Sequence, residues 1–147
     1  MWSYAEFLPV DIKYAVTLGE GGTPLVECPT LVDGEDIKLY IKDESQNPTW
    51  SFKDRLCSVA VSKAVEIGAK KITIASTGNH GASTAAYAGR AGLDSVVFTL
   101  ESVPETMKIQ IGAYGAKILA TKEPKDRWVL MKECIDKFQW YPTGNYM

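Results

Sequence analysis

A lysine near the start of a predicted helix is the first candidate for chemistry. Lys53 stands in the segment Asn47–Arg55 (NPTWSFKDR), just before apolar residues that recur every three or four positions. In the first turn of a helix the dipole disfavours an ammonium by about 0.3–1 kcal/mol, too little to make the amine neutral. Burial beside Phe52 or a cationic neighbour would have to lower the pKa of the amine further. A neutral amine condenses with aldehydes and moves protons. The alternative, a solvated lysine partnered by Asp54, is favoured by position alone.

A second segment, Ser76–Gly81 (STGNHG), follows a predicted strand and opens a predicted helix. Free backbone N–H groups at a helix N-terminus attract anions, and glycine allows close approach. The hydroxyls of Ser76 and Thr77 and the amide of Asn79 add donors, so a carboxylate or phosphate would suit this place. Ordinary helix capping by the same side chains explains the pattern equally well. His80 alone is more typical of a helix start than of a catalytic base.

Three other kinds of site have little support. The sequence has one histidine and three widely spaced cysteines, Cys28, Cys57 and Cys134, with no Cys-x-x-Cys pair. A structural zinc site therefore lacks ligands, and a Ser-His-Asp triad would depend on one imidazole. Leu18–Leu25 (LGEGGTPL) is glycine-rich but lacks Walker spacing. It predicts a turn leading into a strand rather than a phosphate-binding loop.

The elements that must position these residues alternate along the chain. Strands are expected at residues 38–42, 71–75, 95–100 and 117–120. Helices are expected at residues 51–67, 79–91, 104–114 and 126–138. Alternation with short links predicts a parallel sheet with flanking helices and right-handed crossovers. Ligands in such sheets bind at the carboxyl ends of strands, so the loops after Ala75 and Leu100 are expected to hold a site.

Periodicity also predicts details of two helices. The apolar stripe of the first consists of Leu56, Val59, Ala60, Ala64 and Ile67. The inner face of the last is expected to contain Val129, Leu130, Ile135 and Phe138. Ser51 and Asp54 are spaced as a capping box at the start of the first helix.

Composition narrows the class of protein. The chain has 147 residues, a length typical of one domain, with 46% hydrophobic and 23% charged residues. The net charge of −2 lacks the basic excess of nucleic-acid binders. No apolar run approaches the roughly 18 residues that cross a bilayer, and the N-terminus lacks the features of a signal peptide. We therefore expect neither nucleic acid nor membrane as a partner. The separated cysteines predict reduced thiols in the cytoplasm.

Taken together, five segments resemble threonine synthases and their relatives among the fold-type II enzymes that use pyridoxal phosphate. They are Leu18–Leu25 (LGEGGTPL), Ile41–Glu44 (IKDE), Asn47–Arg55 (NPTWSFKDR), Ser76–His80 (STGNH) and Tyr114–Leu119 (YGAKIL). The ordered set is far more specific than any single piece. It overturns the preference for a solvated Lys53.

The resemblance implies a role for each matching residue. Lys53 matches the lysine that holds pyridoxal 5'-phosphate covalently and later moves protons. Asn79 matches the asparagine that hydrogen-bonds the cofactor ring hydroxyl, and Phe52 matches a packing group beside the lysine. The loop implied to receive the substrate carboxylate contains Ser76, Thr77, Gly78, Asn79 and His80. The implied reaction converts O-phosphohomoserine and water to threonine and phosphate, with the cofactor as electron sink.

Two departures from the family pattern keep alternatives open. Trp50 stands where the pattern often has glycine, and His80-Gly81 follows Asn79 where many threonine synthases have small hydroxyl residues. The second departure resembles serine and threonine dehydratases, and cysteate synthase is another close relative. A Rossmann-like nucleotide-binding module that uses Ser76–Gly81 is the alternative from another class, although Gly-x-Gly-x-x-Gly is absent from this turn.

The resemblance also implies a domain organisation. Enzymes of this family are more than twice as long, and their glycine-rich loop for the cofactor phosphate lies downstream. Residues 1–50 would be an incomplete part of the large domain. Residues 51–147 would form the small α/β domain, ending near Tyr141–Met147 (YPTGNYM), where the chain returns to the large domain. We expect this fragment to be inactive alone and the full-length parent to be a homodimer.

Overall fold

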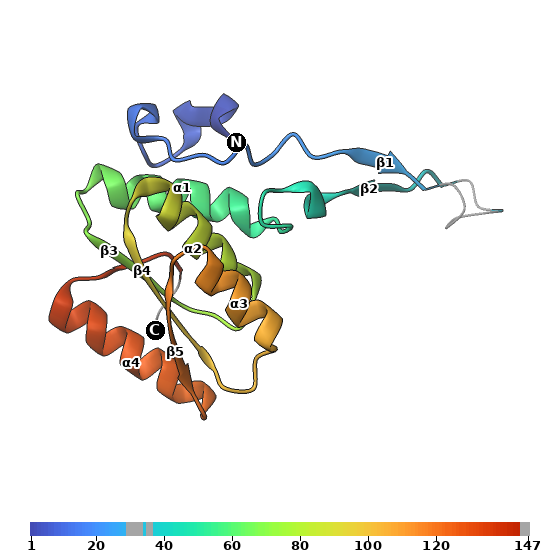
Figure 1. Ribbon diagram of the computed structural model, residues 1–147. Coiled ribbons are helices and arrows are strands. Elements are labelled where there is room, and N and C mark those ends of the chain that lie inside the picture. The colour runs from blue at the N-terminus through green and yellow to red at the C-terminus, as the bar shows by residue number, and fades with distance from the viewer. Residues whose placement is uncertain (29–33, 35–36, 145–147) are drawn as a thin grey trace.

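A four-stranded parallel sheet forms the centre of the protein (Figure 1). The computed structural model describes residues 1–28, 34 and 37–144. The strands are β3 (Lys71–Ala75), β4 (Asp94–Leu100), β5 (Lys117–Thr121) and β6 (Tyr141–Pro142). The α-helices are α1 (Lys53–Glu66), α2 (Asn79–Ala91), α3 (Glu105–Ala113) and α4 (Pro124–Phe138). This architecture confirms the α/β fold class and the parallel sheet predicted from the sequence.

Helices cover both faces of the sheet (Figure 1). Successive side chains of a strand point to opposite faces, so neighbouring residues of β4 show which helix lies on which side. Val97 packs in a buried cluster with Ala85 of α2 and Ile111 of α3. Val96 and Phe98 pack instead against Met131 of α4. Hence α2 and α3 cover one face and α4 covers the other. Helix α1 shares a further cluster with β3 and α2.

The strand order reverses at β3. In the order β5–β4–β3–β6, the chain first builds outward from β3 to β5, and α4 then carries it back to the other side of β3. Strand β6 pairs there through Ile72↔Tyr141 and Thr73↔Pro142. A proline is tolerated because β6 is an edge strand. Such a reversal opens a crevice at the carboxyl ends of β3 and β6, where ligands of open α/β sheets bind.

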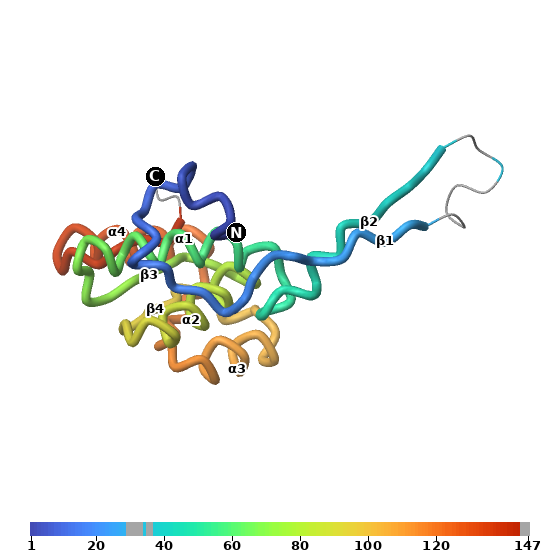
Figure 2. The backbone as a smooth tube through the Cα atoms, turned by 90° about the horizontal axis from the view of Figure 1, so that it is seen from above, coloured from blue at the N-terminus to red at the C-terminus, as the bar shows by residue number. Residues whose placement is uncertain are grey.

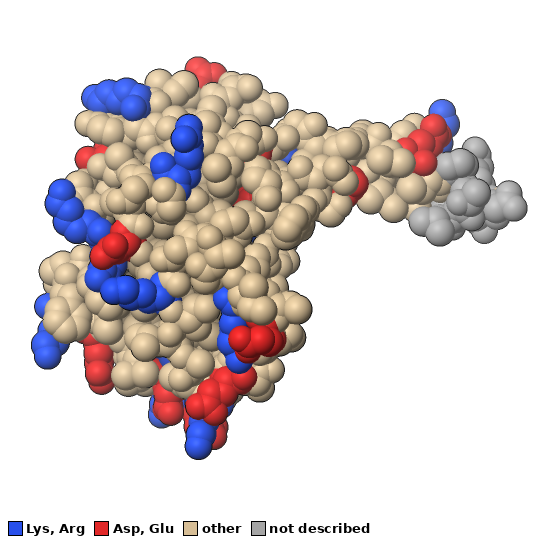
Figure 3. All heavy atoms as spheres, viewed as in Figure 1, with Lys and Arg blue, Asp and Glu red and all other residues tan. Residues whose placement is uncertain are grey.

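The described part of residues 1–52 contributes no strand to this sheet. It forms the 3-10 helices η1 (Trp2–Phe7), η2 (Ile12–Tyr14) and η4 (Glu44–Gln46), and an antiparallel hairpin of β1 (Leu25–Glu27) and β2 (Tyr40–Lys42). The hairpin projects from the body as an arm (Figures 1 and 2). On the face shown in Figure 3, charges of both signs are interspersed over the body. No helix within the described residues is long and apolar enough to cross a membrane. The division into domains at residue 50 stays a prediction.

The predicted apolar stripe of α1 is wrong in part, because Ala64 is fully buried but the two ends of the stripe are not. Leu56 and Ile67 are 44% and 56% exposed. Apart from Val61, the buried residues of α1 are small or polar: Asp54, Cys57, Ser58, Ser62 and Ala64. Hydrogen bonds allow this burial, because the Ser58 hydroxyl donates to the Val16 carbonyl (2.8 Å) and the Ser62 hydroxyl accepts from the Val16 N–H (2.7 Å).

The predicted inner face of α4 is also wrong in part. Val129, Leu130 and Phe138 are exposed, and only Ile135 belongs to the packed side. The fully buried residue is Met131, beside Trp128 and Cys134. Two apolar stripes overlap on this helix, so periodicity alone does not choose between them.

Candidate active site

Lys53 lies near the carboxyl ends of the strands of the parallel sheet. It is the first residue of α1, and its side chain lines a cavity of about 310 Å³. The other lining residues are Leu56, Ile74, Ala75, His80, Trp128 and Gly144. Because Ala75 ends β3 and Gly144 closely follows β6, the cavity lies at the reversal of strand order. This is the place that the topology favours for a ligand.

The amine of Lys53 has no carboxylate partner within the described residues. Its Nζ lies 4.6 Å from the ring centroid of Phe52. The ion pairs found in residues 1–28, 34 and 37–144 do not include Lys53. The alternative in which Asp54 partners a solvated Lys53 is therefore not what the structure has.

Asp54 instead joins the turn before α1 to helix α2. Its carboxylate is fully buried and accepts hydrogen bonds from the Thr49 N–H (2.6 Å), the Thr49 hydroxyl and the Ser83 hydroxyl (2.7 Å). The predicted capping box is half present. The Ser51 hydroxyl accepts a hydrogen bond from the Lys53 N–H (3.2 Å). The Asp54 carboxylate, however, accepts from Thr49 and Ser83 and not from the backbone N–H of Ser51. The start of α1 is thus fixed against α2.

A second carboxylate connects three of the segments that carry the family resemblance. Glu44 accepts two hydrogen bonds from Arg55, at 2.7 and 2.8 Å, one from the Thr23 hydroxyl (2.6 Å) and one from the Asn47 amide (3.0 Å). The hydrogen bond from the Arg55 guanidinium, followed by that from Thr23, lowers the pKa of Glu44 to about 2. These residues support the site rather than line the cavity.

The glycine-rich segment anchors the N-terminal part to α2. As predicted, it is a turn that leads into a strand, which begins at Leu25. The buried Glu20 carboxylate accepts from the Tyr87 hydroxyl (2.7 Å) and the Leu18 N–H (3.1 Å). The Gly21 N–H donates to the Asn47 side chain (3.0 Å).

The turn between β3 and α2 combines capping with free donors. The buried Ser76 hydroxyl accepts from the N–H groups of Gly78 (3.2 Å) and Gly81 (3.0 Å), so Ser76 does serve as a cap. The side chains of Thr77 and Asn79 are exposed at this turn. Within the described part of the chain, no acceptor contacts the backbone N–H of Asn79 or His80. These free donors keep the anion-binding interpretation available beside capping.

His80 is brought to Lys53. Its Nε2 lies 3.2 Å from the Thr143 carbonyl oxygen, so Nε2 carries a proton and donates it. Burial, followed by the nearby positive charge of Lys53, lowers the pKa of His80, whereas the hydrogen bond to Thr143 raises it. Of the residues expected from the sequence, Lys53 and His80 line the same cavity. Ser76 is buried in the turn between β3 and α2, whereas the side chains of Phe52, Thr77 and Asn79 are exposed.

Five lining residues were not predicted as site residues: Leu56, Ile74, Ala75, Trp128 and Gly144. The first three lie next to the predicted site along the chain, whereas the last two come from other segments. Trp128 belongs to the packed side of α4, whose inner face was predicted with a different set of residues. Gly144 lies in the segment that the resemblance marks as the return of the chain, and this was the only signal for it. Its place in the site depends on the pairing of β6 with β3.

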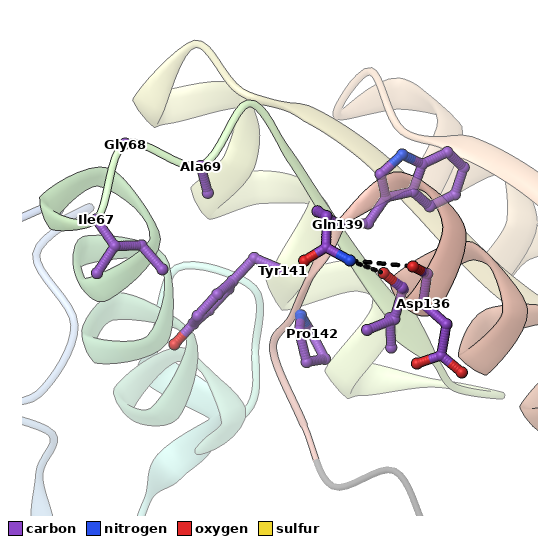
Figure 4. Close-up of a pocket in the computed structure, with 9 residues that line it drawn as sticks. Ile67, Gly68, Ala69, Asp136, Gln139, Tyr141 and Pro142 are labelled. Carbon is purple, nitrogen blue, oxygen red and sulfur yellow. Dashed lines mark hydrogen bonds between the residues drawn. The ribbon is translucent and has the colours of Figure 1, made fainter.

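A separate hollow lies at the opposite ends of the strands, where β3 and β6 begin (Figure 4). It has a volume of about 410 Å³ and lies between the Ile67–Ala69 turn, before β3, and the Gln139–Pro142 segment, where β6 begins. The Gln139 amide donates to the carbonyls of Ile135 (3.5 Å) and Asp136 (3.0 Å), as Figure 4 shows. This hollow is at the amino ends of the strands, away from Lys53.

Comparison with known proteins defines the class. The chain belongs to the family of pyridoxal-phosphate dependent enzymes, whose family model matches residues 16–147. Two threonine synthases are similar to it: that of Methanosarcina acetivorans (44% identity over 124 residues, covering 83% of this chain and 30% of the relative) and that of Methanocaldococcus jannaschii (46% over 125 residues, covering 83% and 31%). The chain thus spans about a third of the length of these relatives.

Solved structures agree on the fold. O-ureido-L-serine synthase superposes with a TM-score of 0.72 at 26% identity, covering 82% of this chain and 40% of the other. A pyridoxal 5'-phosphate-dependent aspartate racemase gives 0.76 at 25% identity, covering 82% and 39%. Diaminopropionate ammonia lyase from Escherichia coli gives 0.77 at 19% identity, covering 86% and 38%, which shows the fold alone.

The residues present fit the cofactor of this family. Pyridoxal 5'-phosphate carries an aldehyde, which requires an amine that is not committed to an ion pair. Lys53 offers such an amine inside a cavity, and the start of α2 offers free N–H donors beside it. The family match therefore favours this cofactor over the nucleotide-binding alternative.

We predict that the Glu44→Gln variant has a flatter acid unfolding profile. The folded pKa of Glu44, about 2, lies below its ordinary value of 4.5. Its contribution to stability is therefore fully present above pH 4.5 and lost as the pH falls toward 2. Urea unfolding of this chain across that range should show a smaller loss of stability for Glu44→Gln than for the wild type. The exposed control Glu105→Gln should follow the wild type. Parallel curves for all three proteins would contradict the assignment.

The backbone conformation of Trp50 explains why the family pattern often has glycine at this position, and it generates a second prediction. Its φ of 60° is left-handed, a conformation that glycine adopts without strain, and its indole is 68% exposed. Trp50→Gly should stabilise the chain by up to about 1 kcal/mol, since left-handed backbone costs an L-residue about 1–2 kcal/mol and glycine loses part of that gain in the unfolded state. Trp50→Ala keeps the Cβ and should bring no such gain. Equal unfolding midpoints for the glycine and alanine variants would refute the explanation.

Proposed function

We propose that this chain supplies the reactive lysine of a pyridoxal-phosphate-dependent threonine synthase, which converts O-phosphohomoserine and water to threonine and phosphate. The observation that carries the proposal is the Lys53 amine, which lines a cavity at the carboxyl edge of the sheet without a carboxylate partner in the described residues. Eight relatives named threonine synthase, at 41–46% identity, support this activity over others of the family.

Each expected site residue has a task in this proposal. Lys53 would hold the cofactor through its amine and move protons at Nζ, beside the Phe52 ring. The Asn79 amide would hydrogen-bond the cofactor ring hydroxyl. The substrate carboxylate would bind at the start of α2, where the turn from Ser76 to His80 presents free N–H donors. The bound cofactor supplies an electron sink, and the chain's own residues bind, orient and exchange protons.

The remaining expectations belong to the same proposal. Relatives are about three times as long as this chain, so the group that binds the cofactor phosphate is expected in a part of the enzyme outside these residues. Residues 1–50 and 51–147 would then belong to the large and small domains. We expect the isolated chain to be inactive and the full-length enzyme to be a homodimer. The free thiols of Cys28, Cys57 and Cys134 favour a reducing compartment, the cytoplasm.

A dehydratase is the second candidate function, and one observation favours it. His80 follows Asn79, as in the dehydratase pattern, and the structure brings this imidazole into the cavity of Lys53. A serine or threonine dehydratase would release an oxoacid and ammonia from the amino acid. Cysteate synthase stays a further alternative within the same fold.

We predict that borohydride reduction of the full-length protein with pyridoxal phosphate attaches the cofactor to Lys53, because this amine lines the cavity. Peptide mapping by mass spectrometry identifies the modified residue. Lys53→Ala should abolish the labelling, whereas Lys63→Ala, ten residues along the same helix and paired with Glu66, should retain it. Labelling of a different lysine in the wild type would defeat the proposal.

Substrate choice separates threonine synthase from dehydratase. We predict that the full-length holoenzyme releases phosphate from O-phosphohomoserine and forms threonine, because its relatives carry that name at more than 40% identity. Phosphate assay and amino-acid analysis measure this reaction, and an oxoacid assay with serine and threonine measures the other. Oxoacid release from serine without phosphate release from O-phosphohomoserine would replace the first function by the second.

A further inference from the structure

The segment that follows β6 is held by hydrogen bonds to strand β3 and to helix α2. Thr143 is 4% exposed, and its N–H donates to the Thr73 carbonyl of β3 (3.0 Å). Its hydroxyl bonds with the Thr84 hydroxyl of α2 (2.9 Å), and its carbonyl accepts from His80 Nε2 (3.2 Å). The backbone of this segment is therefore fixed both to the sheet and to the helix that starts beside Lys53.

The next residue passes through a narrow gap. A Cβ on Gly144 would lie 2.7 Å from Ile74 Cδ1 and 2.9 Å from His80 Cε1. Both distances are shorter than real side-chain contacts, so only glycine passes between β3 and the imidazole without displacing them. Gly144, His80 and Lys53 line the same cavity. Residues 143–144 are here called the return segment, and Gly144 is the residue of this segment that forms part of the cavity wall.

We propose that His80 is a positioning residue that fixes the return segment as a wall of the Lys53 cavity. Its imidazole touches the segment in two ways: Nε2–H donates to the Thr143 carbonyl, and the ring edge bounds the gap occupied by Gly144. The inference rests on the proposed function only in taking Lys53 as the reactive amine. It gives His80, one of the departures from the threonine synthase pattern, a structural task beside the carboxylate loop.

The position of His80 also links its charge to that of Lys53. Burial, followed by the charge of Lys53, lowers the pKa of His80. Lys53 of α1 is the one charged group of the described residues that acts on the imidazole of His80. After β6, the imidazole contacts the carbonyl of Thr143. The cavity residues from β3 and α4 are uncharged. A neutral imidazole with its proton on Nε2 avoids repulsion from the positive charge of Lys53 and donates a hydrogen bond to the Thr143 carbonyl. Loss of the positive charge at residue 53 should therefore let the pKa of His80 rise.

The first test is a pH titration of this chain by NMR. His80 is the only histidine of the chain, so its ring signals need no further assignment. The pKa of His80 should rise in Lys53→Met and stay at the wild-type value in Lys63→Met, whose charge lies further along α1 and pairs with Glu66. The Nε2–H tautomer should dominate in the neutral state. An unchanged pKa in Lys53→Met, or a dominant Nδ1–H tautomer, would overturn the proposal.

The second test measures cofactor attachment to Lys53 in the full-length protein. His80→Gln keeps a donor near the place of Nε2, whereas His80→Leu removes it. Loss of one hydrogen bond should weaken pyridoxal phosphate binding about 2- to 10-fold in His80→Leu, with recovery in His80→Gln. Gly144→Ala should weaken binding as well, while Gly112→Ala, where a Cβ meets nothing within 4 Å, should not.

The outcomes of this second test separate the two proposals. If the wild type carries no cofactor on Lys53, the proposed function fails. If the wild type carries it and His80→Leu and Gly144→Ala bind as tightly as the wild type, the function stands and the positioning role of His80 is refuted.

Discussion

The site depends first on the buried carboxylate of Asp54. A charge without solvent is costly unless hydrogen bonds replace its hydration. Thr49 on one side and Ser83 on the other provide them, so the turn before α1 and helix α2 are held together by one group. The same bonds occupy the carboxylate that stands next to Lys53 in the sequence. The lysine therefore keeps an amine without that counter-ion, which is the condition for reaction with an aldehyde.

The fold was largely predictable because its elements are local, whereas the packing of the elements was not. Strand β3 ran over the residues that its β-branched pattern predicted. The buried side of α1 could not be predicted from hydrophobicity, since Ser58 and Ser62 are buried through bonds to Val16, more than forty residues away in sequence. On α4 the choice between two apolar stripes is made by the sheet, which takes Met131.

The candidate site shows the same division. Lys53 and His80 were expected because they lie in segments whose order resembles a family, and both line the cavity. Gly144 enters it only because β6, two residues long, pairs with β3 about seventy positions away. Trp50 illustrates the reverse case. Its left-handed backbone gives a physical reason for the glycine of the family pattern, and the chain keeps an exposed indole there at a cost in strain.

The topology explains why a lysine on a helix reaches the ligand edge of a sheet. Helix α1 leads into β3 through a short turn at Gly68, so it runs antiparallel to the strand. Its 14 residues extend about 21 Å, slightly more than the roughly 17 Å of β3, and its first residue therefore lies near the strand's carboxyl end. Helix α2 follows β3 and starts at that same end. Two helix N-termini thus converge there, and their dipoles favour a negatively charged ligand where the strand order also opens a crevice.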